Sequence, residues 1–376
     1  MIVKGLIIND LHFGIKDTKR LYEELKLFKE KLSEFKPNLL VVDGDYFDHK
    51  LSIGDPETYY AVSFFNEMLD ICRREHITIR MVQGTRSHEL NQLQLFKPHE
   101  SDKDIDFKII ETVSEEDLFG LHILYLPEEY PMDSEEYYKD FKAPDKRYNI
   151  IFGHGTWDDI AFDSQIDLGA QTSTLSAPVF VYDNWKHTIP NGFISFGHIH
   201  SRHTFHKKLF YSGSYTRWGF GERSARGFSC FEYDTEKLVW KLDYIDNDLA
   251  PSFEVMSISE LDESIKSGSV DEIKVALDAR VSQADNIRID LSGLPKDTLE
   301  ILKKYYKDNQ NVKIEVKEQT TIKEAAAVDK KEFEKWHYIT KRQLPLNQTI
   351  KKYCSEELKK DIELDVIDKT IAAPTE

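Results

Sequence analysis

An alternation of strand and helix patterns at the start of the chain limits its possible folds more than any other feature. Residues 2–9 form an apolar, strand-like run, and apolar residues then recur every three or four positions as far as Phe35, the spacing of one helix face. A second strand (NLLVVDGD), a second helix pattern over residues 56–75 and a third strand (ITIRMVQG) follow. This βαβαβ order predicts a mixed or parallel sheet with helices on its faces.

The sequence after these elements is rich in strands as far as residue 247. Its strand patterns are LHILYLP, YNIIFGHG, GFISFGHIH, LFYSGS and GFSCFEYD. They predict a second sheet packed on the first. The pattern breaks at DNDLAPS, residues 246–252. We therefore predict an α/β domain over 1–247, a small βαβ unit over 252–320 and a helical extension over 321–376, whose apolar stripe from Leu346 to Ile362 would bury one helix face against a partner.

Composition excludes several classes of protein. The three cysteines are far apart and form no CxxC pair, which predicts thiols rather than disulfides or a structural zinc site. No stretch approaches the roughly 18 consecutive apolar residues of a membrane span, and no cleavable signal precedes the first strand, so we expect a cytoplasmic protein with no membrane partner. The formal net charge of −17 argues against non-specific adhesion to nucleic acid.

Carboxylate and imidazole side chains follow five of the predicted strands at their C-terminal ends. In an α/β sheet, these ends are where ligands bind. Oxygen and nitrogen donors in this number suit a pair of divalent first-row ions such as manganese, iron or zinc, and two ions about 3.5 to 4 Å apart can clamp the attacking and leaving oxygens of a phosphoryl displacement. The residues are Asp10, His12, Asp45, Asp48, His88, His154, His198 and His200.

The motifs D-x-H, G-D-x-x-D, a G…H-E element, G-H-G and G-H-x-H, in this order, resemble those of the calcineurin-like metallophosphoesterases. Within that superfamily the chain is similar to the SbcD-type nuclease subunit of DNA double-strand-break repair complexes, including phage recombination nucleases. The segment YSGSYTRWGFGE at 211–222 carries part of this narrower resemblance. It implies a four-layer α/β/β/α sandwich, with the βαβ unit as a DNA-capping domain.

The resemblance also implies a role for each position in the metal site. The first ion would be held by Asp10, His12 and His200, the second by His154 and His198, and Asp45 would bridge the two. His88 would be the catalytic histidine, which protonates the leaving oxygen or stabilises the phosphorane. Asp48 would orient the ring of His88. The expected cofactor is two divalent ions, Mn²⁺ in the first place, with Mg²⁺, Fe²⁺ or Zn²⁺ as alternatives.

One loop departs from the family pattern. The family has G-N-H-[DE], and its asparagine supplies a carbonyl oxygen to the second ion, whereas this chain reads GTRSHE at 84–89. We place Ser87 at the asparagine position, as a weaker ligand of the second ion. Water in the vacant place and direct contact of Arg86 with the phosphate are the alternatives.

Residues 201–227 contain six basic side chains against one acid. We expect this segment to make sequence-independent contacts with the DNA backbone, and a solvated hairpin face is the alternative. With the loop arginine, the predicted DNA-binding residues are Arg86, Arg202, Lys207, Lys208 and Arg217.

The sequence thus favours a metal-dependent DNA nuclease that acts in recombination or repair. We expect exonuclease activity on duplex ends, endonuclease activity on single strands, an SbcC-type coiled-coil ATPase as partner and a homodimer. The chain has no GxxxxGK[ST] loop, so ATP hydrolysis would belong to the partner. Two alternatives stay open: a stand-alone phosphodiesterase or phosphatase for nucleotides or phosphoproteins, and a DNA-end-binding scaffold whose metal site has decayed at Ser87.

Overall fold

The computed structural model of the protein describes residues 1–15, 17–161, 179–222 and 224–316, with positions 348, 351, 355 and 364. The chain divides into two compact units, Met1–Glu315 and Val316–Glu376. The predicted helical extension at 321–376 and its apolar stripe lie almost wholly outside the described residues. Over the described part of the chain, no helix combines the length and the apolar character that a membrane crossing requires.

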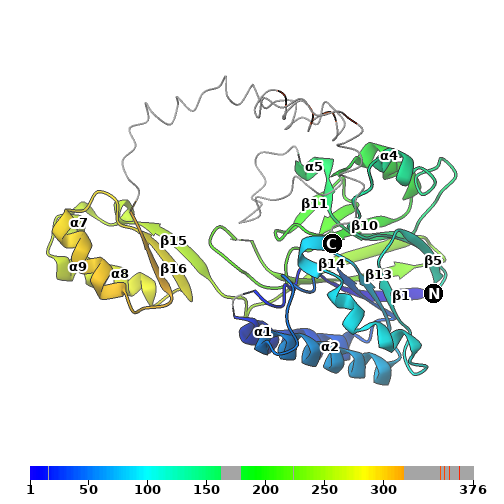
Figure 1. Ribbon diagram of the computed structural model, residues 1–376, viewed down its shortest axis with the longest axis horizontal. Coiled ribbons are helices and arrows are strands. Elements are labelled where there is room, and N and C mark those ends of the chain that lie inside the picture. Colours follow the sequence, from blue (N-terminus) through cyan, green and yellow to red (C-terminus); the bar gives the residue numbers. More distant parts are fainter. Residues whose placement is uncertain are drawn as a thin grey trace. The chain divides into compact units, whose positions relative to one another are not determined.

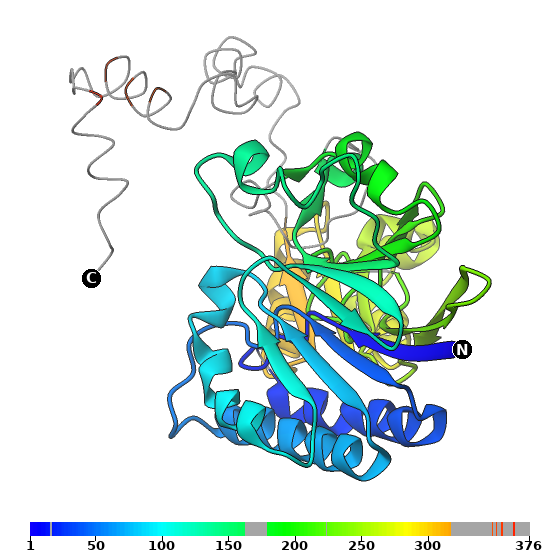
Figure 2. The same cartoon turned by 90° about the vertical axis from the view of Figure 1, so that its right-hand side faces the viewer.

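The first sheet has six strands in the order β14-β13-β1-β2-β3-β4. Its parallel strands are β1 (Ile2–Ile8), β2 (Leu39–Asp43), β3 (Thr78–Val82) and β4 (Phe107–Ile110), and two antiparallel strands, β13 (Gly227–Asp234) and β14 (Val239–Asp246), complete it beside β1. Helices α1 (Thr18–Phe35) and α2 (Pro56–Glu75) connect the first three strands, as predicted. In Figures 1 and 2 these blue helices lie side by side along the outer face of this sheet.

The second sheet also has six strands, in the order β11-β12-β10-β7-β6-β5. Strands β6 (Leu121–Leu126), β7 (Ile150–His154), β10 (Phe193–Gly197) and β12 (Leu209–Tyr211) are parallel, and β5 (Ser114–Leu118) and β11 (His203–Phe205) are antiparallel edge strands. The shorter elements beside the sheets are α3 (Arg86–Glu89), α4 (Ser134–Tyr137), α5 (Asp158–Ala161), α6 (Tyr182–Trp185) and a ribbon of β8 (Thr156–Trp157) and β9 (Val179–Phe180).

Three apolar cores separate the layers, because successive side chains of a strand point to opposite faces. Leu6 and Ile8 of β1 pack with α1 and α2, whereas Val3 and Ile7 of the same strand pack against side chains of the second sheet. A further core lies on the other face of that sheet, around Trp157. The order is therefore helix, sheet, sheet, helix, which confirms the predicted fold class.

Residues 253–315 form a smaller α/β arrangement with a core of its own. Strands β15 (Phe253–Ser257), β16 (Asn286–Asp290) and β17 (Val312–Glu315) make a parallel sheet, with α7 (Glu263–Lys266), α8 (Val270–Val281) and α9 (Lys296–Tyr306) between them. The sequence predicted the β16-α9-β17 part. The structure adds β15 and α8 before it, and Ser269 with Glu272 forms a capping box that starts α8.

The buried Arg80 links the two large sheets. It lies on β3 with 3% of its side chain exposed, and it donates from Nε and Nη2 to the two carboxylate oxygens of Glu116 on β5, both at 2.8 Å. It also donates to Asp106, which precedes β4. Burial alone would raise the pKa of Glu116, but the hydrogen bonds and charge of Arg80 hold it below the ordinary value.

Arg80→Leu is expected to lower the free energy of unfolding by about 2 to 3 kcal/mol at pH 7, because Glu116 is then left partly buried without a partner. The loss is smaller than for a fully buried ion pair, because the other partner, Asp106, is half-exposed and solvated. The folded-state pKa of Glu116 is depressed, so its contribution is complete above the unfolded value of about 4.3 and is lost as the pH falls through the folded value. Denaturant unfolding of the wild type and Arg80→Leu should show a difference in free energy of unfolding that is smaller at pH 3 than at pH 7. Equal free energies of unfolding at pH 7 would show that Arg80 does not stabilise the fold through Glu116.

Candidate metal centre

The predicted ligands meet where the carboxyl ends of both large sheets converge. Strands β1, β2 and β3 end beside one another in the first sheet, and β7 and β10 are neighbours in the second. Two hydrogen bonds cross between the sheets at this point: the backbone N–H of His198 donates to Asp10 Oδ1 at 2.9 Å, and His154 Nδ1 lies 2.9 Å from the carbonyl oxygen of Asp43. The site is therefore built from both sheets.

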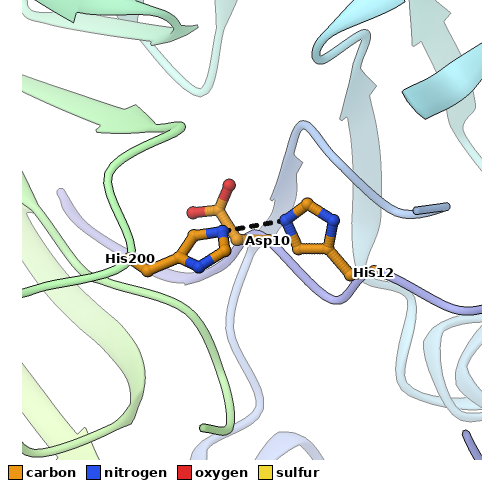
Figure 3. A group of neighbouring side chains, drawn as sticks. All are labelled: Asp10, His12 and His200. Atoms are coloured by element: carbon orange, nitrogen blue, oxygen red, sulfur yellow. Dashed lines mark hydrogen bonds between the residues drawn. The ribbon is translucent and has the colours of Figure 1, made fainter. Parts of the chain in front are cut away.

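Within the described residues, the side chains form three groups whose donor atoms lie within 4.8 Å of one another. Figure 3 shows the first group, in which His12 and His200 point their rings toward each other with Nε2 atoms 2.9 Å apart. Six of the seven residues lie at or just after strand ends and are buried, and the seventh, His88, lies in α3 after β3. The groups are Asp10, His12 and His200; His12, Asp45 and His88; and Asp45, His154 and His198.

Four of these residues have a left-handed backbone, which is uncommon for residues other than glycine. Their φ angles are 52° at Asp10, 49° at His12, 48° at Asp45 and 93° at His198. Each such residue costs of order 1 to 3 kcal/mol and persists only where the surrounding structure enforces it. Sharp turns directly after the strands aim these side chains into one small volume.

The ring of His154 is fixed so that Nε2 faces the acidic groups. Nδ1 donates to the Asp43 carbonyl, which leaves Nε2 as the acceptor, 3.2 Å from Asp45 Oδ2. This Nε2 is buried and makes no hydrogen bond with the described residues. Burial alone would lower the pKa of His154, but the surrounding carboxylates raise it well above its ordinary value. A negative field of this kind attracts a cation.

A buried acid, Glu222, orients His200. Its Nδ1 lies 3.3 Å from Glu222 Oε1, which leaves Nε2 facing His12, and the backbone N–H of Trp218 donates to Glu222 Oε2 at 2.7 Å. A carboxylate behind a ligating imidazole fixes the tautomer and raises the basicity of the ligand. Glu222 was inside the segment 211–222 that carried the narrower family resemblance, but no role was predicted for it.

Two glycines give Asp45 room to enter the site. A Cβ on Gly84 would lie 2.2 Å from the backbone nitrogen of Asp45 and 2.4 Å from its Oδ1. Gly44 has φ +86°, and a Cβ there would lie 2.0 Å from His154 Nδ1. Buried Glu89 adds a tether between the loops, because its Oε1 accepts the Tyr46 N–H at 2.7 Å. Burial raises the pKa of Glu89 to about 8.

His88 is the most exposed of the seven, with 28% of its side chain accessible. Its Nδ1 lies 3.2 Å from His12 Nδ1 and 3.7 Å from Asp45 Oδ2. Burial, opposed by the charge of Asp45, lowers its pKa below the ordinary value. This imidazole stands at the rim of the metal centre, where a substrate can reach it.

Asp48 differs from its expected place. Its Oδ1 lies 3.2 Å from His12 Nδ1, and its Oδ2 lies 3.0 Å from His49 Nδ1. Among the described contacts it makes no hydrogen bond to His88. The backbone N–H of Asp48 donates to the carbonyl of Phe13, which brings the carboxylate beside the loop that carries His12. Asp48 therefore orients His12, a predicted ligand, rather than the predicted catalytic histidine.

The sequence matches the calcineurin-like phosphoesterase family over residues 4–202. The chain belongs to this family. The matched region is more than half of the chain and contains all seven residues of the metal centre. A search of curated proteins gives no match. One crystal structure is similar at 15% identity over 65% of this chain and 99% of its own, with a TM-score of 0.39, which adds nothing to the assignment.

The donor set of this calcineurin-like phosphoesterase fits the divalent metal ions that the family uses. Imidazole nitrogens and carboxylate oxygens bind first-row ions at about 2.0 to 2.2 Å, so donors around one ion lie about 3 to 3.5 Å apart. The His12–His200 distance of 2.9 Å and the His154–Asp45 distance of 3.2 Å are of this size. The Nε2 of buried His154, which faces carboxylates but makes no hydrogen bond with the described residues, is a further sign of a cation site.

In this loop Thr85, and not the predicted Ser87, contacts Asp45. Its backbone N–H donates to Asp45 Oδ1 at 2.6 Å, and its hydroxyl lies 3.1 Å from Asp45 Oδ2. Ser87 is exposed. Arg86 and Ser87 begin α3, and both are exposed.

Glu128 is a site residue that the sequence interpretation missed. It follows β6 by two residues and is 2% exposed, and its Oε2 lies 3.1 Å from the Thr85 hydroxyl. Burial raises its pKa, while His154 acts in the opposite direction. The signal was available, since Glu128 ends a strand as the other site residues do.

The five predicted DNA-binding residues have different surroundings. Arg86 and Lys207 are exposed, and the structure gives their side chains no hydrogen bond or ion pair with the described residues. Three others donate to backbone carbonyls: Arg202 to Arg226 and Ile245, Lys208 to Ile189 and Pro190, and Arg217 to Ala250 and Pro251. Arg202 also pairs with Asp246 and stacks on Tyr244. These three cations hold the fold together, which reduces what they can offer to DNA.

Proposed function

We propose that this phosphoesterase is a metal-dependent DNA nuclease with exonuclease activity on duplex ends and endonuclease activity on single strands. The observation that carries the proposal is the α3 turn, which presents exposed Arg86 two residues from rim residue His88. A nucleic-acid strand has further phosphates on either side of the scissile one, whereas a small ester does not. A guanidinium beside the catalytic group suits such a flanking phosphate.

In this proposal, one set of residues holds the metal ions and His88 acts on the substrate. Asp10, His12 and His200 would hold one ion, and His154 and His198 the other, with Asp45 between them. Bound divalent ions, Mn²⁺ in this proposal, supply a nucleophile at neutral pH and Lewis-acid stabilisation of the phosphoryl oxygens. His88 contacts the scissile group from the rim and supplies a proton to the leaving oxygen.

Two further features support a polymeric substrate. Residues 253–315 form an α/β arrangement with its own core, which hydrolysis of a small ester does not require. Phe220, from the segment similar to SbcD-type nucleases, packs edge-on against Phe253 and under Arg288 of this arrangement. We propose that the arrangement formed by residues 253–315 guides DNA toward the metal centre.

The proposal includes an SbcC-type coiled-coil ATPase as partner and a homodimer of this chain, with a role in recombination or repair. Its support is the resemblance of the sequence to SbcD-type nucleases. Light scattering of the purified protein should give twice the mass of one chain, and addition of the ATPase should form a stable complex.

Substrate size separates a nuclease from a phosphodiesterase for small molecules. We expect kcat/KM for an oligonucleotide of about 20 residues to exceed that for bis(4-nitrophenyl) phosphate by 10²-fold or more, since remote binding contributes to the transition state. Similar values for the two substrates would contradict the proposal.

Arg86→Ala is expected to weaken DNA binding uniformly across sequences and to reduce the slope of log K against log salt by about 1, because one phosphate contact is lost. Binding to a labelled duplex, measured by fluorescence anisotropy at four salt concentrations with Ca²⁺ to prevent cleavage, gives the slope. Lys26→Ala, a change of the same charge at an exposed position of α1, is the matched control. An unchanged slope in Arg86→Ala would show that this arginine does not contact phosphate.

A further inference from the structure

We propose that Glu128 is a ligand of the second metal ion and that, with Thr85, it replaces the asparagine amide of the family pattern. The inference builds on the metal centre of the proposed function and names a donor that the family motifs do not include. It makes the second site of this protein more acidic than a site with asparagine.

The distances around Glu128 Oε2 are those of donors that share one ion. This oxygen lies 3.4 Å from His198 Nδ1 and 3.7 Å from His154 Nε2, the two imidazoles assigned to the second ion. It is also 3.1 Å from the Thr85 hydroxyl, which in turn is 3.1 Å from Asp45 Oδ2. Donors held at about 2.1 Å from one ion are about 3 to 3.5 Å apart.

The backbone holds Glu128 in this place. Strand β6 is hydrogen-bonded to β7, with Leu126 opposite Gly153, so the residues after β6 emerge beside His154. The N–H of Glu128 donates to the carbonyl of Gln83, the residue before Gly84, at 3.2 Å. The Tyr130 hydroxyl donates to Oε1. One carboxylate oxygen is thereby occupied, and Oε2 is directed at the metal centre.

The contacts of Glu128 are those of a ligand rather than of a structural salt bridge. A carboxylate that is 2% exposed needs a cation or several donors to offset its lost hydration. No Lys or Arg among the described residues pairs with Glu128; its neighbours are two hydroxyls and two imidazoles. A divalent ion beside Oε2 would supply the missing positive charge.

The substitution changes the chemistry of the second site. An asparagine amide is neutral, whereas Glu128 adds a negative charge to that of Asp45. The added carboxylate strengthens attraction for a divalent cation and keeps an oxygen donor in the place of the amide oxygen, which Mn²⁺ and Mg²⁺ accept readily. A weak hydroxyl at the asparagine position is then compatible with two bound ions.

Titration of metal-free protein with Mn²⁺ tests the inference without any activity assay. Free Mn²⁺ is measured by its electron paramagnetic resonance signal, and calorimetry gives the affinities. The wild-type protein is expected to bind two ions per chain. Glu128→Ala should bind the first ion as the wild type does and the second about 10- to 100-fold more weakly. Glu128→Gln, which keeps an oxygen donor but loses the charge, should lie between.

Two matched variants make the result specific. Glu129→Gln removes the same charge one residue away and should bind both ions normally. Thr85→Asn, added to Glu128→Ala, restores the amide of the family and should recover most of the second-site affinity. Identical binding by wild type and Glu128→Ala would overturn the inference, as would fewer than two ions in the wild type. Because Mn²⁺ binding is the readout, absence of DNA cleavage would contradict the proposed function and leave this result standing.

Discussion

His88→Ala is expected to lower the rate of DNA cleavage about 10²- to 10⁴-fold while both metal ions remain bound, because general acid catalysis contributes an effect of this size. His88 is the partly exposed imidazole at the rim, and the six other residues of the donor groups, which would hold the ions, are buried. Cleavage of a labelled oligonucleotide at saturating Mn²⁺ gives the rate, and Mn²⁺ titration gives the stoichiometry.

The position of His88 near His12 and Asp45 leaves one other role to test, that of a metal ligand. A ligand would lose an ion on substitution, so a stoichiometry below two in His88→Ala would contradict the catalytic assignment. Ser87→Ala, at the exposed preceding residue, is the matched control and should cleave DNA at the wild-type rate. Loss of activity in that control would return Ser87 to the site.

Asp45→Asn is expected to lower the affinity for both ions and to reduce cleavage by 10³-fold or more at limiting Mn²⁺, because a bridging carboxylate offsets the charge of two cations at once. Asp45 belongs to two of the three donor groups and accepts hydrogen bonds from Thr85. Burial would raise its pKa, but His154 and its neighbours hold it well below the ordinary value, so it is charged at neutral pH.

Metal content after dialysis and the cleavage rate together measure the effect of Asp45→Asn. Asp117→Asn, which removes the same charge from an exposed position on β5, is the control and should retain two ions. Normal binding of both ions by Asp45→Asn would show that the carboxylate does not bridge.

The strands and helices that the sequence predicted are those with one dominant apolar pattern. Strands β1, β2 and β3 are mainly apolar because both faces of the sheet are covered, and α1 and α2 each have a clear apolar stripe. Strand β5, with sequence SEEDL, was missed because an edge strand needs little apolar surface. Strand β14 was missed for the same reason: its residues are exposed or half-exposed.

The sequence predicted those site residues whose positions follow from the ends of strands. Carboxyl ends of parallel strands share an edge, so the sequence alone brought together Asp10, Asp45 and the histidines. It could not decide which of Thr85, Arg86 and Ser87 turns inward, because the α3 turn depends on the tether between Glu89 and Tyr46. Glu128 ends a strand as the other site residues do, but no motif surrounds it, and its partners Thr85, His154 and His198 come from three other segments.

Surface charge was the least predictable property. The sequence predicted Arg202 and Arg217 to face solvent in a basic segment, but both donate hydrogen bonds to backbone carbonyls. A sequence does not show which arginines meet carbonyl groups left without partners at strand ends and linkers. Arg86 and Lys207 are the cations of the predicted set whose side chains are exposed.

Digestion of an end-labelled linear duplex beside a closed circle of the same sequence tests the central claim most directly. The purified protein is supplied with Mn²⁺, Mg²⁺ or a chelator. A DNA nuclease that acts on ends shortens the linear duplex with Mn²⁺, spares the closed circle and is inactive with chelator. Mn²⁺-dependent hydrolysis of bis(4-nitrophenyl) phosphate with no cleavage of linear or single-stranded DNA, alone or with the partner ATPase, would contradict the nuclease assignment and leave a phosphodiesterase for small substrates.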